Sequence, residues 1–522
     1  MNDVEKTDTA LEEKRYTEHV ESSSTFGQAA EPHVGAVKVP ARIFTRAEED
    51  KLYRKVDLRL MPILAVLYLL SFMDRGNIGN ARIEGLEADL GMTSQDYNTA
   101  LSCFFITYCL CEVPANLVMK KFRRPSRWLG LVTTVWAIVM TLMGVVTSFG
   151  GLLAARLALG VAEAGLFPGV ILYLSIWYPR ERSQARVGFF FGAATLAGAF
   201  SGLLAYGIGF MRGLEGLATF VVGVASFWLI SDYPNECKWL TQEEKEWLIY
   251  RRATDNSKVG EAEHVSKSFI WSAFSTWQTW LSIGYYLGVV VPLYAISLIS
   301  PTLVAGLGDY SRAQTQLLTV PYYVVAFLFV MAVSGENPAR SNKANDLVGL
   351  LNPAAVLSDR YKTRFPFLMI ELTLCVIGLV INISPAPSGV KYFGIYLIAM
   401  GAYGGLPTSV TWLSNNLSGQ TKRAVGSAAQ IGLGNLGALA SSNVYRKQDK
   451  PHYYLGHGVV LGFVMLGYIC GPLYAVMLKR ENARKTEWLE QQAMLPEEQR
   501  TQYTVEELRA QGDKAADFKY LI

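Results

Sequence analysis

The chain has 522 residues, of which 51% are hydrophobic and only 18% are charged, and its mean hydropathy is +0.21. Soluble domains usually carry about 25% charged residues, so this composition excludes an ordinary soluble protein. Apolar runs of about twenty residues recur along the chain and predict a polytopic, all-α membrane protein. The net charge of +4 is modest. Membrane topology explains the basic segments of the chain, so we expect no nucleic-acid partner.

The cysteines and histidines suggest neither a disulfide framework nor a metal site. Five of the six cysteines lie in apolar runs, and only Cys237 lies outside them. The five histidines lie outside the cores of the apolar runs or near the start of one. We therefore expect no metal and no bound cofactor, and no nucleophile–base constellation indicates an enzyme.

Taken in chain order, the apolar runs predict twelve transmembrane helices in two halves of six. Residues 1–50 are polar and predict a disordered tail, with no apolar core that would make them a signal peptide. The N-terminal half, 51–232, is expected to hold spans at 57–81, 97–119, 128–147, 152–178, and two within 187–230 that are split near 207–213.

A central connection, 233–276, joins the halves, and Thr241 and Glu244 have the spacing of a capping box that begins a surface helix. The C-terminal half, 277–478, is expected to hold spans at 277–300, 316–333, 365–383, 391–413, 422–445 and 454–478. A charged, partly helical tail, 479–522, follows.

Lysine and arginine are concentrated in the short loops that follow the even-numbered spans. Five lie within 120–127 and three within 180–186. By the positive-inside rule, both termini and the central connection face the cytoplasm. We expect an integral protein of the plasma membrane that acts as a monomer.

The first span contains an adjacent acid and base. Leu60–Met73 is uncharged, but its fourteen residues rise only about 1.5 Å each and cannot cross a core of about 30 Å. The helix must therefore continue to about Ala81, which places Asp74 and Arg75 inside the membrane, where charges usually mark a substrate or ion pathway. The alternative is that the helix ends at Met73 and the charged pair lies at the outer interface.

The fourth span supplies matching charges. Arg156, Gly160 and Glu163 recur at i, i+4 and i+7, so they share one helical face. Their depths match that of Asp74 on the antiparallel first span, which predicts one buried cluster of four charges. A purely structural ion-pair lock between the two spans is the alternative, although arginine suits a carboxylate substrate through its bidentate fork.

Other polar residues within spans are weaker candidates. Glu112 fits a structural partner of the basic loop at least as well as a proton site. The remaining residues could line a cavity, although core packing or an interhelical hydrogen bond is the default for each. They are Tyr285, Tyr286, Tyr294, Trp412, Asn415, Asn416, Gln430 and Asn435.

These motifs resemble a known family. The chain has twelve predicted spans in two halves, a basic loop between spans two and three, and a similar basic loop at 358–364 between spans eight and nine. This pattern looks like the major facilitator superfamily. The runs 74–81, 112–116 and 156–163, with Phe167-Pro168-Gly169, are similar to its anion:cation symporter branch. Trp239-Leu240-Thr241, followed by two glutamates, is similar to the fungal allantoate and nicotinate permease group.

The resemblance, which covers roughly 51–484, implies proton-coupled uptake of a small organic anion by alternating access, with nicotinate-like carboxylates the best single guess. It implies that Arg75 holds the substrate carboxylate, that Asp74 and Glu163 take up protons, and that Arg156 ties their protonation to the substrate. The other residues assigned to substrate binding are Asn77, Tyr286 and Asn415, and those assigned to gating or structure are Glu112, Asn116, Asp359 and Arg360. The partners would be the substrate, protons and the lipid bilayer.

Three features depart from the family pattern. Loop 2–3 lacks the usual glycine and aspartate of the superfamily, and Asn116 and Lys120 stand in their place. The other two features are a short join and an insert. The join between spans five and six is abnormally short, and an atypical insert, 334–357, precedes Asp359. We hypothesise an imperfect gene model, which a transcript that encodes both features as written would exclude. The same features motivate the alternative function, a transport-inactive nutrient sensor or a defective product of the same fold.

Overall fold

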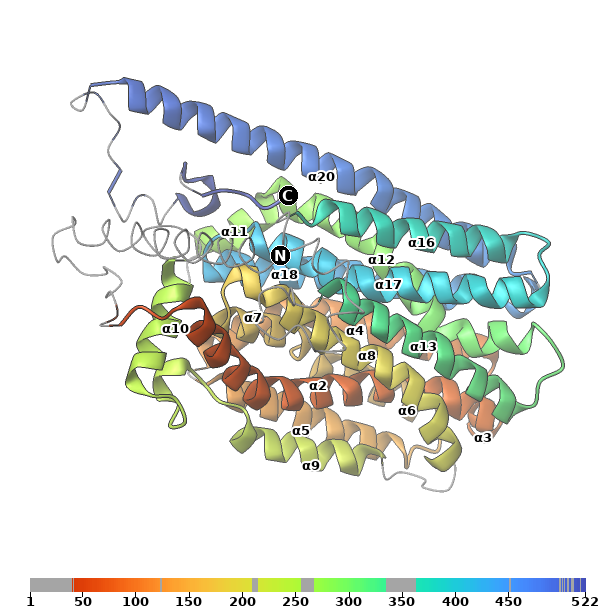
Figure 1. The fold of residues 1–522 in the computed structure, drawn as a ribbon. Coiled ribbons are helices and arrows are strands. Elements are labelled where there is room, and N and C mark those ends of the chain that lie inside the picture. Colours follow the sequence, from red (N-terminus) through yellow and green to blue (C-terminus); the bar gives the residue numbers. More distant parts are fainter. Residues whose placement is uncertain are drawn as a thin grey trace, which may run out of the picture.

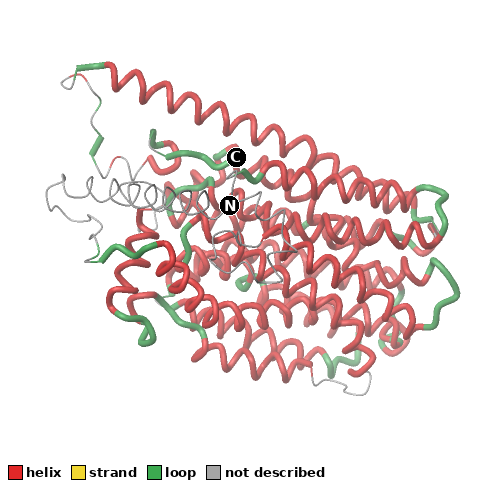
Figure 2. Tube along the Cα trace, viewed as in Figure 1, coloured by secondary structure: helices red, strands yellow, loops and turns green. Residues whose placement is uncertain are grey.

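The computed structural model describes residues 40, 42–122, 124–208, 215–254, 267–334, 363–449 and 452–496 and, after these, 499, 501, 503–504, 507, 511–516 and 518–522. Within these residues all regular structure is helical, and no strand occurs (Figure 2). The long helices lie side by side in one bundle (Figure 1). The predicted all-helical fold is confirmed.

The first half of the bundle begins with α2 and ends with α9. Its helices are α2 (Arg46–Glu84), α3 (Leu86–Asp89), α4 (Ser94–Lys121), α5 (Pro125–Met143), α6 (Phe149–Glu163), α7 (Phe167–Trp177), α8 (Arg180–Ile208) and α9 (Glu215–Leu229). Because α2 continues to Glu84, Asp74 and Arg75 lie well inside it. The alternative in which the helix ends at Met73 is therefore wrong.

The fourth predicted span, 152–178, is not one continuous helix. It is broken between α6 and α7 at residues 164–166. Pro168 has no N–H to donate to the carbonyl of Ala164, so the regular ladder cannot continue through this point. Gly165 lies against the indole of Trp128, whose Nε1 donates to the Gly165 carbonyl at 3.3 Å. The break leaves Glu163 at the C-terminal end of α6.

A short helical region separates the two halves. It comprises η1 (Pro234–Glu236), α10 (Gln242–Thr254) and α11 (Lys267–Ser275). The predicted capping box is confirmed: the Thr241 N–H donates to Glu244 at 2.8 Å, and the Glu244 N–H donates to the Thr241 hydroxyl at 3.3 Å. Lys55 of α2 also pairs with Glu244 at 2.8 Å. The cap therefore holds α10 against the start of α2, at what we name the α10 end of the bundle.

The second half runs from α12 to α20. Its helices are α12 (Trp277–Ala305), α13 (Arg312–Ser334), α16 (Phe365–Ile383), α17 (Ser388–Asn415), α18 (Gln420–Asn435), α19 (Gly437–Val444), η3 (Lys447–Asp449) and α20 (Tyr454–Met494). The helix α20 continues past its apolar part and overhangs the bundle (Figure 1). In the described part of the chain, nine spans meet the length and hydropathy of a membrane crossing, and 185–200 and 219–229 form shorter apolar helices. The count of twelve stays a prediction.

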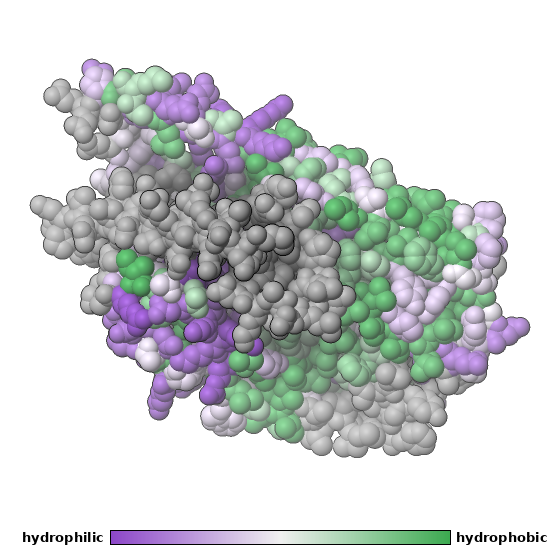
Figure 3. All heavy atoms as spheres, in the orientation of Figure 1, coloured by the Kyte–Doolittle hydropathy of each residue, from purple (hydrophilic) through white to green (hydrophobic). Residues whose placement is uncertain are grey.

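The surface matches a membrane protein. Hydrophobic residues cover much of the bundle wall, whereas hydrophilic residues gather at the α10 end (Figure 3). Large apolar side chains face outward, among them Leu110 at 71% exposed and Trp228 at 79% exposed. Soluble monomers rarely expose extended apolar surface, so this wall suits lipid.

The halves meet along two seams. In one, α8 packs on α13, where Gly198 lies directly on the ring of Tyr323. In the other, α4 packs on α18 and α19, which we name the α4–α18/α19 seam. Near the α10 end of this seam, Asn116 donates to the carbonyl of Ala424 at 2.8 Å. Near the opposite end, Asn443 donates to Ser102 at 3.3 Å. The seam is therefore bridged at both ends.

The C-terminal segment packs on the α10 end of the second half. It includes η5 (Gly512–Lys514). Asp513 forms a buried ion pair with Lys422 of α18 at 2.7 Å. The carbonyl of Leu521 accepts from Trp412 and Asn416 at the end of α17, at 3.1 and 2.8 Å. This segment therefore supplies polar partners to side chains that α17 and α18 leave buried.

Candidate functional site

The centre of the bundle holds a charged pair between α2 and α6. The Nε of Arg75 donates to Glu163 Oε1 at 3.0 Å. Ser71, one turn earlier on α2, donates to the same oxygen. The side chain of Glu163 is only 1% exposed and that of Arg75 is 10% exposed. Pairing makes these charges tolerable at this depth, because an isolated buried charge is costly.

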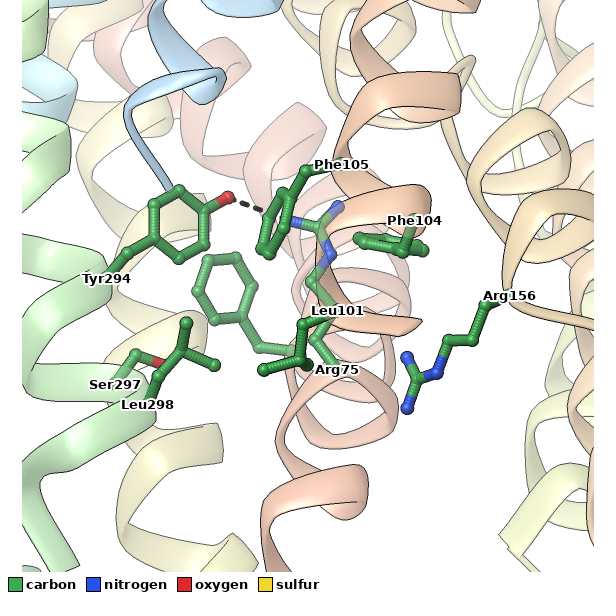
Figure 4. Close-up of a pocket in the computed structure, with 9 residues that line it drawn as sticks. Arg75, Leu101, Phe104, Phe105, Arg156, Tyr294, Ser297 and Leu298 are labelled. Carbon is green, nitrogen blue, oxygen red and sulfur yellow. Dashed lines mark hydrogen bonds between the residues drawn. The ribbon is translucent and has the colours of Figure 1, made fainter. Parts of the chain in front are cut away.

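Arg75 also reaches across to the second half. Its Nη1 donates to the hydroxyl of Tyr294 on α12 at 3.4 Å (Figure 4). That hydroxyl donates in turn to the Oδ1 of Asn435, the last residue of α18, at 3.4 Å. A polar chain therefore runs from Glu163 in the first half, through Arg75, to Asn435 in the second.

Aromatic rings surround the guanidinium. The centroids of Tyr108, Phe72 and Phe104 lie 4.7, 5.3 and 5.8 Å from Arg75 Cζ. A cation within about 6 Å of a ring face is attracted by the ring quadrupole. The site therefore combines a fixed positive charge with flat apolar walls, which suits an anion carried on a planar or apolar body.

Two cavities meet at this arginine and share Phe72, Arg75 and Tyr294. The first cavity is shown in Figure 4, and its other lining residues are Leu101, Phe104, Phe105, Arg156, Ser297 and Leu298. The second is lined in addition by Tyr68, Phe167, Tyr286, Val290, Leu293, Leu406 and Asn435. Both halves contribute to both cavities, as expected for a site at the interface of the two halves.

The predicted cluster of four charges is divided. Asp74 does not share the Arg75–Glu163 pair; its Oδ2 accepts from Trp136 of α5 at 2.7 Å and from Thr219 of α9 at 3.4 Å. The reason is geometric, since adjacent residues on a helix point about 100° apart. Asp74 therefore faces the interior of the first half, while Arg75 faces the second half.

Arg156 is 1% exposed and lines the first cavity together with Arg75. Its Nε and Nη2 have no hydrogen-bond partner among the described residues. It shares the buried face of α6 with Gly160 and Glu163, as the spacing predicts. That face lies on α4, where a Cβ at Gly160 would come within 2.5 Å of the Phe104 carbonyl oxygen.

The remaining predicted site residues have different surroundings. Tyr286 lines the second cavity, whereas Asn415 is buried and lines neither of the two. Glu112 is buried toward Gly432 of α18, and neither carboxylate oxygen is bonded to any described residue. The side chains of Lys120, Lys121 and Arg123 lie outside the described residues, so a pairing of Glu112 with the basic loop stays a prediction. Asn116 bridges the α4–α18/α19 seam.

The structure does not describe the side chains of three predicted site residues. The side chain of Asn77 lies outside the described residues, and so do Asp359 and Arg360 entirely. The short join and the insert fall mostly within 209–214 and 335–362, which also lie outside them. The hypotheses attached to these residues stay predictions.

Sequence reasoning missed two buried features. Glu371 on α16 is 1% exposed and accepts from Thr408 of α17 at 3.0 Å. A lone acid within the apolar run 365–383 was the available signal. The partners of Asp74, namely Trp136 and Thr219, carried no signal, because a tryptophan or a threonine in an apolar run is ordinary.

This arrangement of helices and buried charges can be compared with known proteins. Residues 64–442 match the family described as Major Facilitator Superfamily. The chain belongs to this superfamily. It is 32% identical over 505 residues to the MFS-type transporter cnsO of Penicillium expansum, covering 92% of each chain. It is 29% identical over 450 residues to the high-affinity nicotinic acid transporter of Saccharomyces cerevisiae, covering 84% of this chain and 79% of that one.

A solved superfamily structure supports the fold. The chain is similar to the crystal structure of a bacterial homolog of the human lysosomal transporter Spinster, which is described as inward-facing and unoccupied. The match covers 79% of this chain and 95% of the bacterial chain. The TM-score is 0.51 at 15% identity. With the superfamily assigned, the protein is a membrane transporter and not an enzyme.

Proposed function

We propose that this protein carries a small organic anion into the cell together with protons, and that its substrate is a nicotinate-like carboxylate. The observation that carries the proposal is the position of Arg75. It is largely buried, it pairs with Glu163 of the first half, and it contacts Tyr294 of the second half. A guanidinium held at this junction can bind a carboxylate through two parallel N–H groups.

The same contacts suggest how proton and substrate are coupled. In the structure Glu163 occupies the Nε of Arg75, so the acid competes with any carboxylate for the guanidinium. Protonation of Glu163 removes its charge, weakens that pair and frees Arg75 for the substrate. Asp74 is the second proton carrier that we propose, and Arg156 links the substrate to these acids.

Binding then requires the halves to separate at one end at a time. Asn116 and Glu112 lie on the α4–α18/α19 seam toward the α10 end, so we assign them to the gate on that side. We place that end in the cytoplasm with both termini, and the protein in the plasma membrane as a monomer. We further assign it to the anion:cation symporter branch and its fungal allantoate and nicotinate permease group. The relative named as a nicotinic acid transporter supports this class of substrate.

Uptake of labelled nicotinate by cells that lack their own carrier tests the proposal. Uptake should be faster at acidic than at neutral outside pH and should collapse when the proton gradient is dissipated. Arg75→Lys should nearly abolish it, because a point charge cannot reproduce the bidentate fork. Arg59→Lys, at an exposed position on the same helix, is the matched control. Normal transport by Arg75→Lys would exclude the clamp.

Two further measurements test the range of substrates and the alternative function, a transport-inactive sensor. Labelled allantoate, pantothenate and sugar acids extend the panel to other carboxylates and to neighbouring substrate classes. Binding of nicotinate without its accumulation would favour a transport-inactive sensor of the same fold.

A further inference from the structure

Arg156 differs from the other buried arginines of the bundle. Arg75 pairs with Glu163 at 3.0 Å, and Arg186 pairs with Asp57 at 2.6 Å. Arg156 is only 1% exposed, yet its Nε and Nη2 have no hydrogen-bond partner among the described residues. Burying a guanidinium without a partner is expensive. A partner from outside the chain would remove this cost.

The two acids that could pair with Arg156 are engaged elsewhere. Asp74 is bonded to Trp136, and Glu163 is bonded to Arg75. Tyr97, Glu163 and Asp74 are all near enough to act on Arg156 electrostatically, but none of them bonds to its Nε or Nη2. Arg156 is therefore not the base of an ion-pair lock between α2 and α6, whereas the Arg75–Glu163 pair does join these two helices.

Arg156 instead points toward the first cavity, which Arg75 also lines, and the two guanidinium groups lie apart (Figure 4). The space between these two basic groups has apolar and aromatic walls from Phe72, Phe104 and Phe105. The cavity is small in this form of the protein, so a ring-sized ligand requires the two halves to separate. Two basic donors beside aromatic walls would then suit a flat molecule with an acceptor at each side.

We propose that Arg156 binds a second acceptor on the substrate, across a planar ring from the carboxylate that Arg75 holds. The substrate class is then a ring carboxylate that carries either a ring nitrogen or a second carboxylate. This inference rests on the proposed function, since it assumes that Arg75 holds the first carboxylate. It makes Arg156 a determinant of specificity in addition to a link to the proton carriers.

Three ligands of nearly one shape separate the roles. Benzoate has one carboxylate, nicotinate adds a ring nitrogen, and isophthalate adds a second carboxylate. Their dissociation constants are measured on the purified full chain from the ligand-induced shift in its unfolding temperature. Nicotinate and isophthalate should bind about tenfold or more tightly than benzoate, the difference expected for one hydrogen bond to a charged group.

In Arg156→Gln this preference should disappear while benzoate binding is kept. Arg59→Gln, at an exposed position, should leave all three affinities unchanged. Arg156→Lys covers the case in which Arg156→Gln does not fold; it should keep part of the preference for isophthalate and lose that for nicotinate.

The remaining outcomes overturn one or both proposals. Equal binding of the three ligands by the unchanged chain, or an intact preference in the Arg156 variants, overturns the inference. If Arg75→Lys then still loses all three ligands, the proposed function stands. In another outcome, an Arg156 variant changes the pH dependence of the dissociation constants equally for all three ligands and leaves the ratios of these constants intact. This outcome also overturns the inference, because it indicates that Arg156 acts in proton coupling alone. Binding of none of the ligands, or binding that is independent of Arg75, overturns both.

Discussion

Gly160 sets how closely α6 can approach α4, and this distance can be tested. An ideal Cβ at Gly160 would lie 2.1 Å from Thr107 Oγ1 and 2.5 Å from the Phe104 carbonyl oxygen. The threonine side chain can rotate, but the carbonyl belongs to the helix backbone. Ordinary contact begins at 3.4 Å, so Gly160→Ala must separate the backbones by about 0.9 Å, the difference between 3.4 and 2.5 Å.

This displacement should affect both stability and binding. Overpacking of this kind costs about 1–3 kcal/mol. Arg156 and Glu163 lie about one turn on either side of Gly160, and a binding site tolerates displacements of only about 0.5 Å. We therefore expect Gly160→Ala to lower the unfolding temperature of the purified chain and to weaken nicotinate binding in the same preparation.

The matched control is Gly150→Ala on the same helix, where an added Cβ meets nothing within 4 Å. It adds the same methyl group to the same helix without the collision. If the two variants unfold at the same temperature and bind nicotinate alike, α4 and α6 are not packed as closely as this structure shows.

Two further predictions concern buried partners. Lys422→Met leaves Asp513 buried without its cation and should lower the free energy of unfolding by about 3–5 kcal/mol. The double variant Lys422→Met/Asp513→Leu should regain most of it, and a double variant as unstable as the single one would contradict this reasoning. Trp136→Phe removes the 2.7 Å donor to Asp74 and should cost about 1.5–3 kcal/mol. Trp228→Phe, at an exposed position, should cost little, and equal losses in the two tryptophan variants would exclude that bond as the cause.

Length and hydropathy were enough to predict the helices that carry the site. The argument that fourteen apolar residues cannot cross a bilayer placed Asp74 and Arg75 inside a helix, and α2 indeed runs to Glu84. The break in the fourth span was readable from Pro168 but was not predicted. Its effect depends on tertiary contacts such as that of Trp128 with Gly165.

The partners of the charges could not be predicted in the same way. Spacing along a helix fixes the depth of a residue, but the rotation of the helix in the bundle decides which neighbour it meets. Asp74 and Arg75 differ by one position and face different helices. Arg156 has the depth of an ion-pair partner and lines a cavity instead.

The α4–α18/α19 seam carries one neutral hydrogen bond near each end, from Asn116 at one end and Asn443 at the other. Each is worth only about 1 kcal/mol. With the alternating access proposed above, each open form gives up a different one of these bonds. The populations of the two open forms therefore depend on the difference between two small energies, and losing one bond would shift their ratio about fivefold. Asn116 and Asn443 are thus positions where one substitution can bias the resting orientation without contacting the ligand.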